Sequence, residues 1–286
     1  MLTYLDIHLT YTLPVVVILA LITCRSIDKL ELLKIILISI IAVIYTTPWD
    51  TYVIYNGAWT YPPDRVLALI GWVPIEEYMF FVIQCIMTIL WSLLCTRLTT
   101  PGFNFNYSKK SYQLIRWIPI LLMGIITIIG YKLAVPGQHT FYLGCILWWS
   151  CPVLAFMWYG AGNFFVKKIS SSLIGIIVPT LYLWRVDQIG LKDNIWHITE
   201  ATSLNIFVID ALPIEEALFF FVTNTIIVLA STCCDKARDM MIVYEKQFPH
   251  KFSISWNFIR QMLIAFATSE YIMSSVTTKN LVKKND

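Results

Sequence analysis

The feature that most constrains this chain is a series of apolar runs of about 16 to 22 residues, long enough to cross a membrane as helices. The sequence is 58% hydrophobic and 14% charged, with a mean hydropathy of +0.68. A soluble domain of 286 residues could not bury that much apolar surface. We therefore expect an all-α integral membrane protein with seven transmembrane helices. The predicted spans are roughly 5–24, 31–47, 74–95, 117–135, 141–160, 169–184 and 211–232.

The distribution of cations predicts the orientation of these spans. The first run is preceded by no basic residue, which favours an uncleaved anchor with its N-terminus outside. Residues 25–34, 96–116, 161–170 and the chain from 233 carry 17 of the 21 Lys and Arg, and the opposite side carries 4. The positive-inside rule then places the C-terminus in the cytosol, in the endoplasmic reticulum or another endomembrane. No basic stripe interleaved with aromatics is present, so we expect no nucleic-acid partner.

The chain also matches itself at an offset of 137 to 139 residues. Each copy contains three spans, in residues 1–100 and 138–239, and the span 117–135 connects them. Both copies therefore begin on the same side, which predicts parallel repeats. The matched residues are Tyr4 and Tyr142, Pro14 and Pro152, Tyr45 and Tyr182, Asp50 and Asp187, Trp59 and Trp196, and the motifs PIEEYMFF (74–81) and PIEEALFF (213–220).

The paired glutamates in these motifs have two interpretations. Proline suits the first turn of a helix, and acids there face the positive end of the helix dipole, an effect worth about 0.3–1 kcal/mol. However, apolar residues precede both motifs, so the acids lie below the membrane interface, where one acid costs up to about 2.5–3.5 kcal/mol. Adjacent glutamates in such a site can share a proton and act as an acid. The candidate catalytic residues are Glu76, Glu77, Glu215, Glu216, Asp50 and Asp187.

Aromatic residues accompany these acids and form the candidate substrate-binding set. Singly they are best explained as interfacial or packing residues, whereas together their ring faces could stabilise a cation. No dinucleotide or Walker motif is present, and the His and Cys residues lack metal-ligand spacing, so we expect neither a cofactor nor a metal. The segment 235–239 has the spacing of a prenyl-diphosphate motif, but standing alone it is better interpreted as a solvated helix end. The candidate binding residues are Trp49, Trp59, Tyr61, Phe80, Phe81, Trp196, Phe219 and Phe220.

The stretches PWDTYVIYNGAWTY, PIEEYMFF, VDQIGLKDNIW and DALPIEEALFFF resemble the membrane-integral lycopene cyclases. These are the cyclase domain of the fungal bifunctional lycopene cyclase/phytoene synthases and the bacterial cyclases of two small subunits. The resemblance covers residues 1–239. It implies closure of the ψ-ends of lycopene to β-ionone rings, through γ-carotene to β-carotene, without net redox change. The acids of the family then map onto Glu76, Glu77, Glu215 and Glu216.

Two departures from the family and several alternatives stay open. Val186 stands where the first repeat has Trp49, so the halves need not be equivalent. The tail 240–286 resembles the linker to a phytoene synthase domain that does not follow in this chain, which implies a functional coupling to such a synthase. The main alternative is a proton-coupled membrane transporter, which the repeats and intramembrane acids also fit. A retinal-type receptor, a carotenoid hydratase and a non-catalytic scaffold fit the residues less well.

Overall fold

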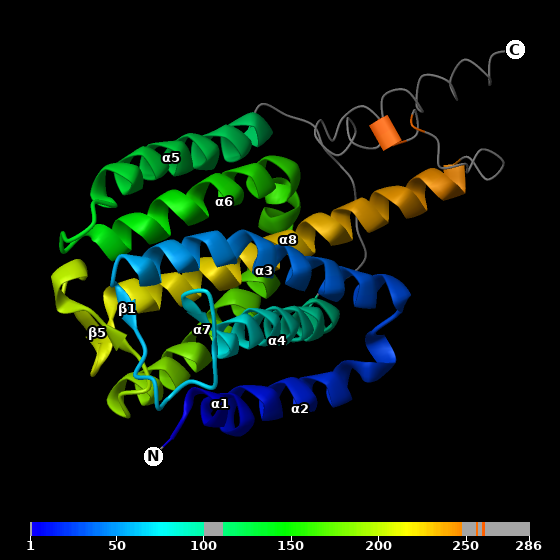
Figure 1. Ribbon diagram of the computed structural model, residues 1–286. Coiled ribbons are helices and arrows are strands. Elements are labelled where there is room, and N and C mark those ends of the chain that lie inside the picture. Colours follow the sequence, from blue (N-terminus) through cyan, green and yellow to red (C-terminus); the bar gives the residue numbers. More distant parts are fainter. Residues whose placement is uncertain (1, 100–110, 248–255, 257–258, 261–286) are drawn as a thin grey trace, which may run out of the picture.

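The computed structural model describes residues 2–99, 111–247, 256 and 259–260, and this part of the chain is mostly helical (Figure 1). Seven of its helices are long and apolar enough to cross a membrane, as the sequence predicts. These candidate spans are Tyr4–Ser26, Lys29–Tyr55, Ile75–Thr96, Leu114–Leu133, Phe141–Lys167, Ile169–Lys192 and Ile214–Ile242. The elements are α1 (Tyr4–Ile7), η1 (His8–Thr12), α2 (Leu13–Thr23), η2 (Cys24–Ser26), α3 (Lys29–Tyr55), α4 (Ile75–Thr99), α5 (Ser111–Leu133), α6 (Phe141–Lys167), α7 (Ile169–Lys192) and α8 (Ile214–Gln247).

The last two helices are longer than predicted. Helix α7 continues through Pro179 to Lys192. The proline removes one backbone hydrogen bond, and a membrane helix tolerates this loss when it is packed against neighbouring helices. Helix α8 continues past residue 232 to Gln247, so the predicted tail begins inside a helix. Beyond that helix, almost all of the expected linker lies outside the described residues.

The helices pack side by side, and α5 lies against α6 along one edge of the molecule (Figure 1). Two glycines permit this approach. A Cβ atom on Gly144 would lie 2.3 Å from the backbone nitrogen of Ala134, and one on Gly130 would lie 2.7 Å from the backbone nitrogen of Trp148. Small residues at such crossings let helix backbones approach closely, which is how apolar helices associate where lipid offers no hydrophobic drive.

The prediction of a purely helical fold is incomplete, because the connections contain three short antiparallel strand pairs. Strand β1 (Trp59–Thr60) pairs with β4 (His197–Ile198) and so joins the loop after α3 to the loop after α7. Strands β2 (Leu69–Ile70) and β3 (Val73–Pro74) form a hairpin before α4, and β5 (Phe207–Ile209) and β6 (Leu212–Pro213) form one before α8. These pairs satisfy backbone groups in segments too apolar to be well solvated. Strands lie together at one end of the helices (Figure 1).

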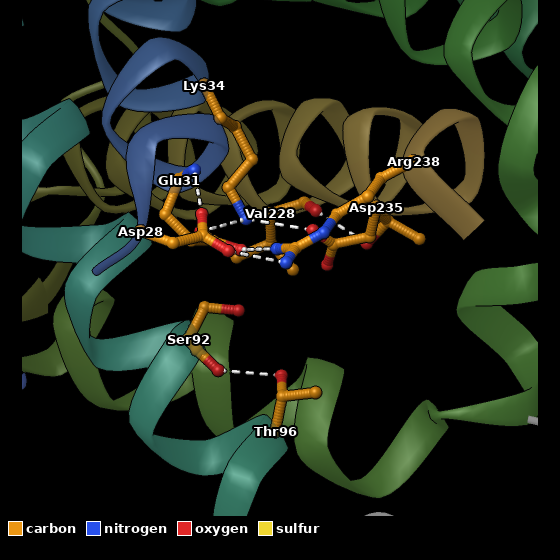
Figure 2. A network of polar contacts seen from close by, with 9 residues as sticks. Asp28, Glu31, Lys34, Ser92, Thr96, Val228, Asp235 and Arg238 are labelled. Atoms are coloured by element: carbon orange, nitrogen blue, oxygen red, sulfur yellow. Dashed lines mark hydrogen bonds and ion pairs between the residues drawn. The ribbon is translucent and has the colours of Figure 1, made fainter. Parts of the chain in front are cut away.

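An ion-pair network ties α3 to α8 at the opposite end (Figure 2). Lys34 Nζ lies 2.7 Å from Glu31 Oε2 and 2.8 Å from Asp235 Oδ1. Arg238 extends the network to Glu31 at 3.2 Å and to Asp28 at 2.5 Å. The expected solvated helix end at 235–239 is therefore wrong for Asp235, which pairs with a buried lysine.

Candidate active site

The repeated motifs converge at the end of the bundle that carries the strands. Helices α4 and α8 begin there with their glutamates, while α3 and α7 end there with Asp50 and Asp187. A cavity of about 40 Å³ lies among them. Of the predicted residues, its walls contain Trp59, Tyr61, Glu77, Phe80, Asp187, Trp196, Glu216, Phe219 and Phe220.

The second glutamate of each motif faces this cavity. Glu77 accepts a hydrogen bond of 2.6 Å from the Tyr61 hydroxyl. Glu216 accepts bonds from the Tyr142 hydroxyl at 2.7 Å and from Trp59 Nε1 at 3.1 Å. Trp59 belongs to the first half of the chain and Glu216 to the second, so this bond crosses between them. Both carboxylates are thus held by donors that fix their orientation.

The first glutamate of each motif anchors a loop instead. Glu76 accepts a hydrogen bond of 2.7 Å from the backbone N–H of Leu67, in the segment before its own helix. Glu215 accepts the corresponding bond of 2.6 Å from Leu204 N–H and a further one from the Ser203 hydroxyl. Neither glutamate lines the cavity, although both are completely buried. These bonds tie each loop to the start of the following helix and do not go to the first turn of that helix, where the capping interpretation expected them.

Asp187 lines the cavity and is held by Trp196, whose Nε1 donates to Oδ1 at 3.0 Å. Gly190, one turn along α7, makes room for that indole. A Cβ atom there would lie 2.1 Å from the Trp196 ring. The glycine therefore places the tryptophan, and the tryptophan orients the aspartate. Val186 lines the same cavity.

The three other predicted residues lie behind the cavity wall. Asp50 is completely buried, and neither carboxyl oxygen has a hydrogen-bond partner. Trp49 stacks on Phe219 with ring centroids 5.5 Å apart and donates to the Cys145 carbonyl at 2.9 Å. Phe81 lines a different cavity, on the far side of Phe219.

Sequence reasoning missed Tyr4, His8 and Tyr142, of which the first two line the cavity. The imidazole of His8 is buried, with Nε2 3.0 Å from the Glu76 carbonyl oxygen and Nδ1 3.2 Å from Thr12 Oγ1. It lies in η1, a π-helical turn, a distortion common at functional sites. The repeat contained a signal for the tyrosines, because Tyr4 and Tyr142 occupy matched positions beside the acids.

The site contains several carboxyl groups and no cationic side chain paired with them among the described residues. In the described part of the chain, none of the six candidate carboxyl groups forms an ion pair with Lys, Arg or His. Burial first, and then the nearby Glu77 carboxylate, raise the pKa of the Tyr61 phenol well above its usual value, so that hydroxyl remains a donor. Among the described residues, no group of three or more His, Cys, Asp or Glu is arranged to hold a metal ion.

The fold and this site define a class: a helical protein with seven helices compatible with membrane spans and a cluster of buried carboxyl groups at one end. Comparison with known proteins identifies relatives of the chain. The chain is 36% identical over 284 residues to the bifunctional lycopene cyclase/phytoene synthase of Phycomyces blakesleeanus, covering 98% of this chain and 47% of that protein. It is 35% identical over 280 residues to that of Blakeslea trispora, covering 96% and 46%, and 40% identical over 240 residues to that of Sporisorium reilianum, covering 82% and 35%.

The chain is therefore a homologue of proteins named bifunctional lycopene cyclase/phytoene synthase, and spans half of their length or less. No protein-family model matches it. No solved structure matches it either.

Proposed function

We propose that this chain is a lycopene β-cyclase corresponding to the cyclase portion of its bifunctional relatives. The observation that carries the proposal is the cavity where Glu77, Asp187 and Glu216 meet a wall of aromatic rings, in a chain homologous to these proteins. The substrates are lycopene and γ-carotene, both hydrocarbons that reside in the bilayer. The reaction class is an isomerisation by an intramolecular lyase.

The chemistry needs a proton donor, a shelter for a cation and a base. A carboxyl group buried without a cationic partner is most readily accommodated as the neutral acid, which suits a proton donor. The proton adds to the terminal double bond of the ψ-end, and the resulting cation is attacked by a neighbouring double bond, which closes the ring. A second carboxylate then removes a proton from the ring, so atoms and electrons balance. Ring faces of Trp59, Phe219 and Phe220 stabilise the cation between these steps.

The two halves of the chain contribute to this site as parallel three-helix units joined by α5. Support comes from matched contacts, since Glu76 and Glu215 each accept from the backbone N–H of a loop just before the helix they begin. The halves have diverged: Trp196 binds the aspartate of its own half, whereas Trp59 binds the glutamate of the other. We propose an endomembrane location with the C-terminus cytosolic, and coupling to a phytoene synthase.

Expression of the chain in a lycopene-accumulating host, followed by pigment analysis, tests the function. We expect β-carotene at the expense of lycopene, and purified protein in lipid should convert lycopene without an ion gradient. A proton-coupled transporter would leave lycopene unchanged and would instead move protons when a gradient is imposed. Unconverted lycopene in the presence of well-folded protein would contradict the proposal.

A further inference from the structure

A second cavity lies deeper in the bundle, between α3, α4, α6 and α8, and has a volume of about 140 Å³. No Asp, Glu, Lys or Arg lines it. Two of its polar members have partners within the protein, since Tyr45 donates to the Trp149 carbonyl at 2.7 Å and Gln84 to Thr223 Oγ1 at 2.9 Å, whereas the buried Trp149 indole N–H has no hydrogen-bond partner. Apart from that single N–H, the lining is mainly apolar and suits a hydrocarbon.

One aromatic layer separates this cavity from the acid site. Phe219 lines both cavities. Its ring lies 5.7 Å from that of Trp59, beside Glu216, and 6.5 Å from that of Trp149, which lines the second cavity. Trp49 stacks on both Phe219 and Trp149, with centroids 5.5 and 4.7 Å away. The two spaces are thus separated by side chains alone.

The lining residues also lead away from the acids along the helix axes. On α8 they run from Phe219 through Thr223 to Ala230, a strip of about 16 Å at the helical rise per residue. On α3 they recede from Asp50 in the same direction, from Thr46 to Ile38. An elongated ligand with one end at Glu216 would therefore continue along this strip.

The cavity is accessible from the side of the bundle rather than from water. Ile41 and Tyr45 line it and are 53% and 37% exposed, on a helix compatible with a membrane span. The acid-site cavity, at about 40 Å³, has no room for more than the end of a long polyene. A substrate whose end is at the carboxyl groups must keep its conjugated chain elsewhere.

We propose that this second cavity holds the part of the conjugated chain next to the reacting end of a linear polyene while that end lies among the carboxyl groups, and admits it laterally between α3 and α6. This subsite rests on the proposed cyclase function and deepens it. Flat rings of Trp149, Phe81 and Phe219 suit a rigid, planar polyene, whereas an acyl chain of a phospholipid would gain nothing from a position next to the acid site.

The test uses Glu216→Gln protein in lipid nanodiscs, which binds lycopene without turning it over. Lycopene is achiral, so circular dichroism in its visible bands arises only when the polyene is held in a chiral site. Ala42 and Ala230 line the cavity, and Ala42→Phe or Ala230→Phe in this background should fill it. We expect at least about tenfold weaker lycopene binding, because several methylene-sized contacts are lost. Ile44→Phe adds the same ring on α3 at a 68% exposed position and should bind normally.

The series Ala42→Val, Ala42→Leu and Ala42→Phe distinguishes filling of the cavity from misfolding. Filling should weaken lycopene binding gradually as the side chain grows, while the melting temperature stays constant. Normal induced dichroism in both filled variants would overturn the proposal. So would native mass spectrometry that finds a phospholipid displaced by the filling residue while lycopene binding persists. Failure of the cyclase function is separately visible, because it leaves lycopene unconverted by the unmodified chain whether or not lycopene binds.

Discussion

At the scale of single residues, each Glu-Glu pair divides its roles. Glu77 and Glu216 face the cavity and are held by tyrosine hydroxyls, whereas Glu76 and Glu215 accept backbone N–H groups from loops. The spacing explains the division, because neighbouring residues on a helix point about 100° apart and cannot share one partner.

Glutamine substitutions separate the two roles. Glu77→Gln and Glu216→Gln should lower the cyclisation rate by about 10²–10⁴-fold at normal protein levels, because an amide supplies no comparable proton. Glu76→Gln and Glu215→Gln keep an acceptor for the backbone N–H and should retain most turnover, with stability lowered by about 1–3 kcal/mol. Product formation per milligram of folded protein, with melting curves, is the measurement. Equal losses of turnover in all four variants would contradict the division.

Gly190 offers a test that touches no acid. A methyl group there overlaps the Trp196 ring, so Gly190→Ala should displace the indole from Asp187. We expect slower cyclisation in Gly190→Ala. Gly137→Ala is a poor control, because the φ of 78° at Gly137 strains any side chain. Gly124→Ala is the better control, since nothing lies within 4 Å of its added atom. Trp196→Phe should reproduce the loss, since it also removes the donor to Asp187, and normal rates in both would show that Trp196 is dispensable.

At the scale of elements, the seven apolar helices follow from run length alone, and the structure contains them. The ends of these helices cannot be predicted from the apolar runs. An apolar run ends at the first polar residues, whereas a helix ends where its backbone hydrogen bonds end. Asp235 illustrates this: helix α8 continues past this charge to Gln247, and Asp235 pairs with Lys34 of α3. The strand pairs were also missed, since strands of two or three residues carry no periodicity.

The crossing of α5 and α6 yields an element-scale prediction. Gly144→Ala introduces a methyl group 2.3 Å from the Ala134 nitrogen, so the helices must separate. We expect a loss of about 1–3 kcal/mol in stability, seen as a lower melting temperature in detergent. Gly124→Ala on α5 makes the same chemical change in open space and should leave the melting temperature unchanged or raise it, since alanine favours helix. Equal melting temperatures for the two variants would mean that the close crossing is absent in the membrane.

At the scale of the whole molecule, the ion-pair network and the candidate active site lie at opposite ends of the helices. A cavity of about 480 Å³ at the end with the ion pairs is lined by three cations and three acids: Lys34, Lys168, Arg238, Glu31, Asp235 and Asp239. Glu216 and Asp235 are separated by roughly 28 Å along α8 at the helical rise. The sequence's cation asymmetry predicts that the acid end faces away from the cytosol. A protease-cleavable tag in the connection after α3, within residues 56–65, should be protected in sealed microsomes, and one at the C-terminus cleaved. The reverse pattern would refute this orientation.

The last prediction concerns whether the two halves form one site or two. One cavity contains Glu77 from the first half and Asp187 and Glu216 from the second, and the Trp59–Glu216 hydrogen bond links them. If this cavity performs every cyclisation, Glu77→Gln and Glu216→Gln should each stop all ring formation, leaving only lycopene. If each half acted alone, either variant would still close one end, and the one-ring product γ-carotene would accumulate. Chromatography of pigments from a lycopene-accumulating host distinguishes these outcomes, with Ile44→Phe as a variant outside both cavities. We expect lycopene alone, because the carboxyl group that donates a proton and the one that removes a different proton from the closed ring must face the same bound end.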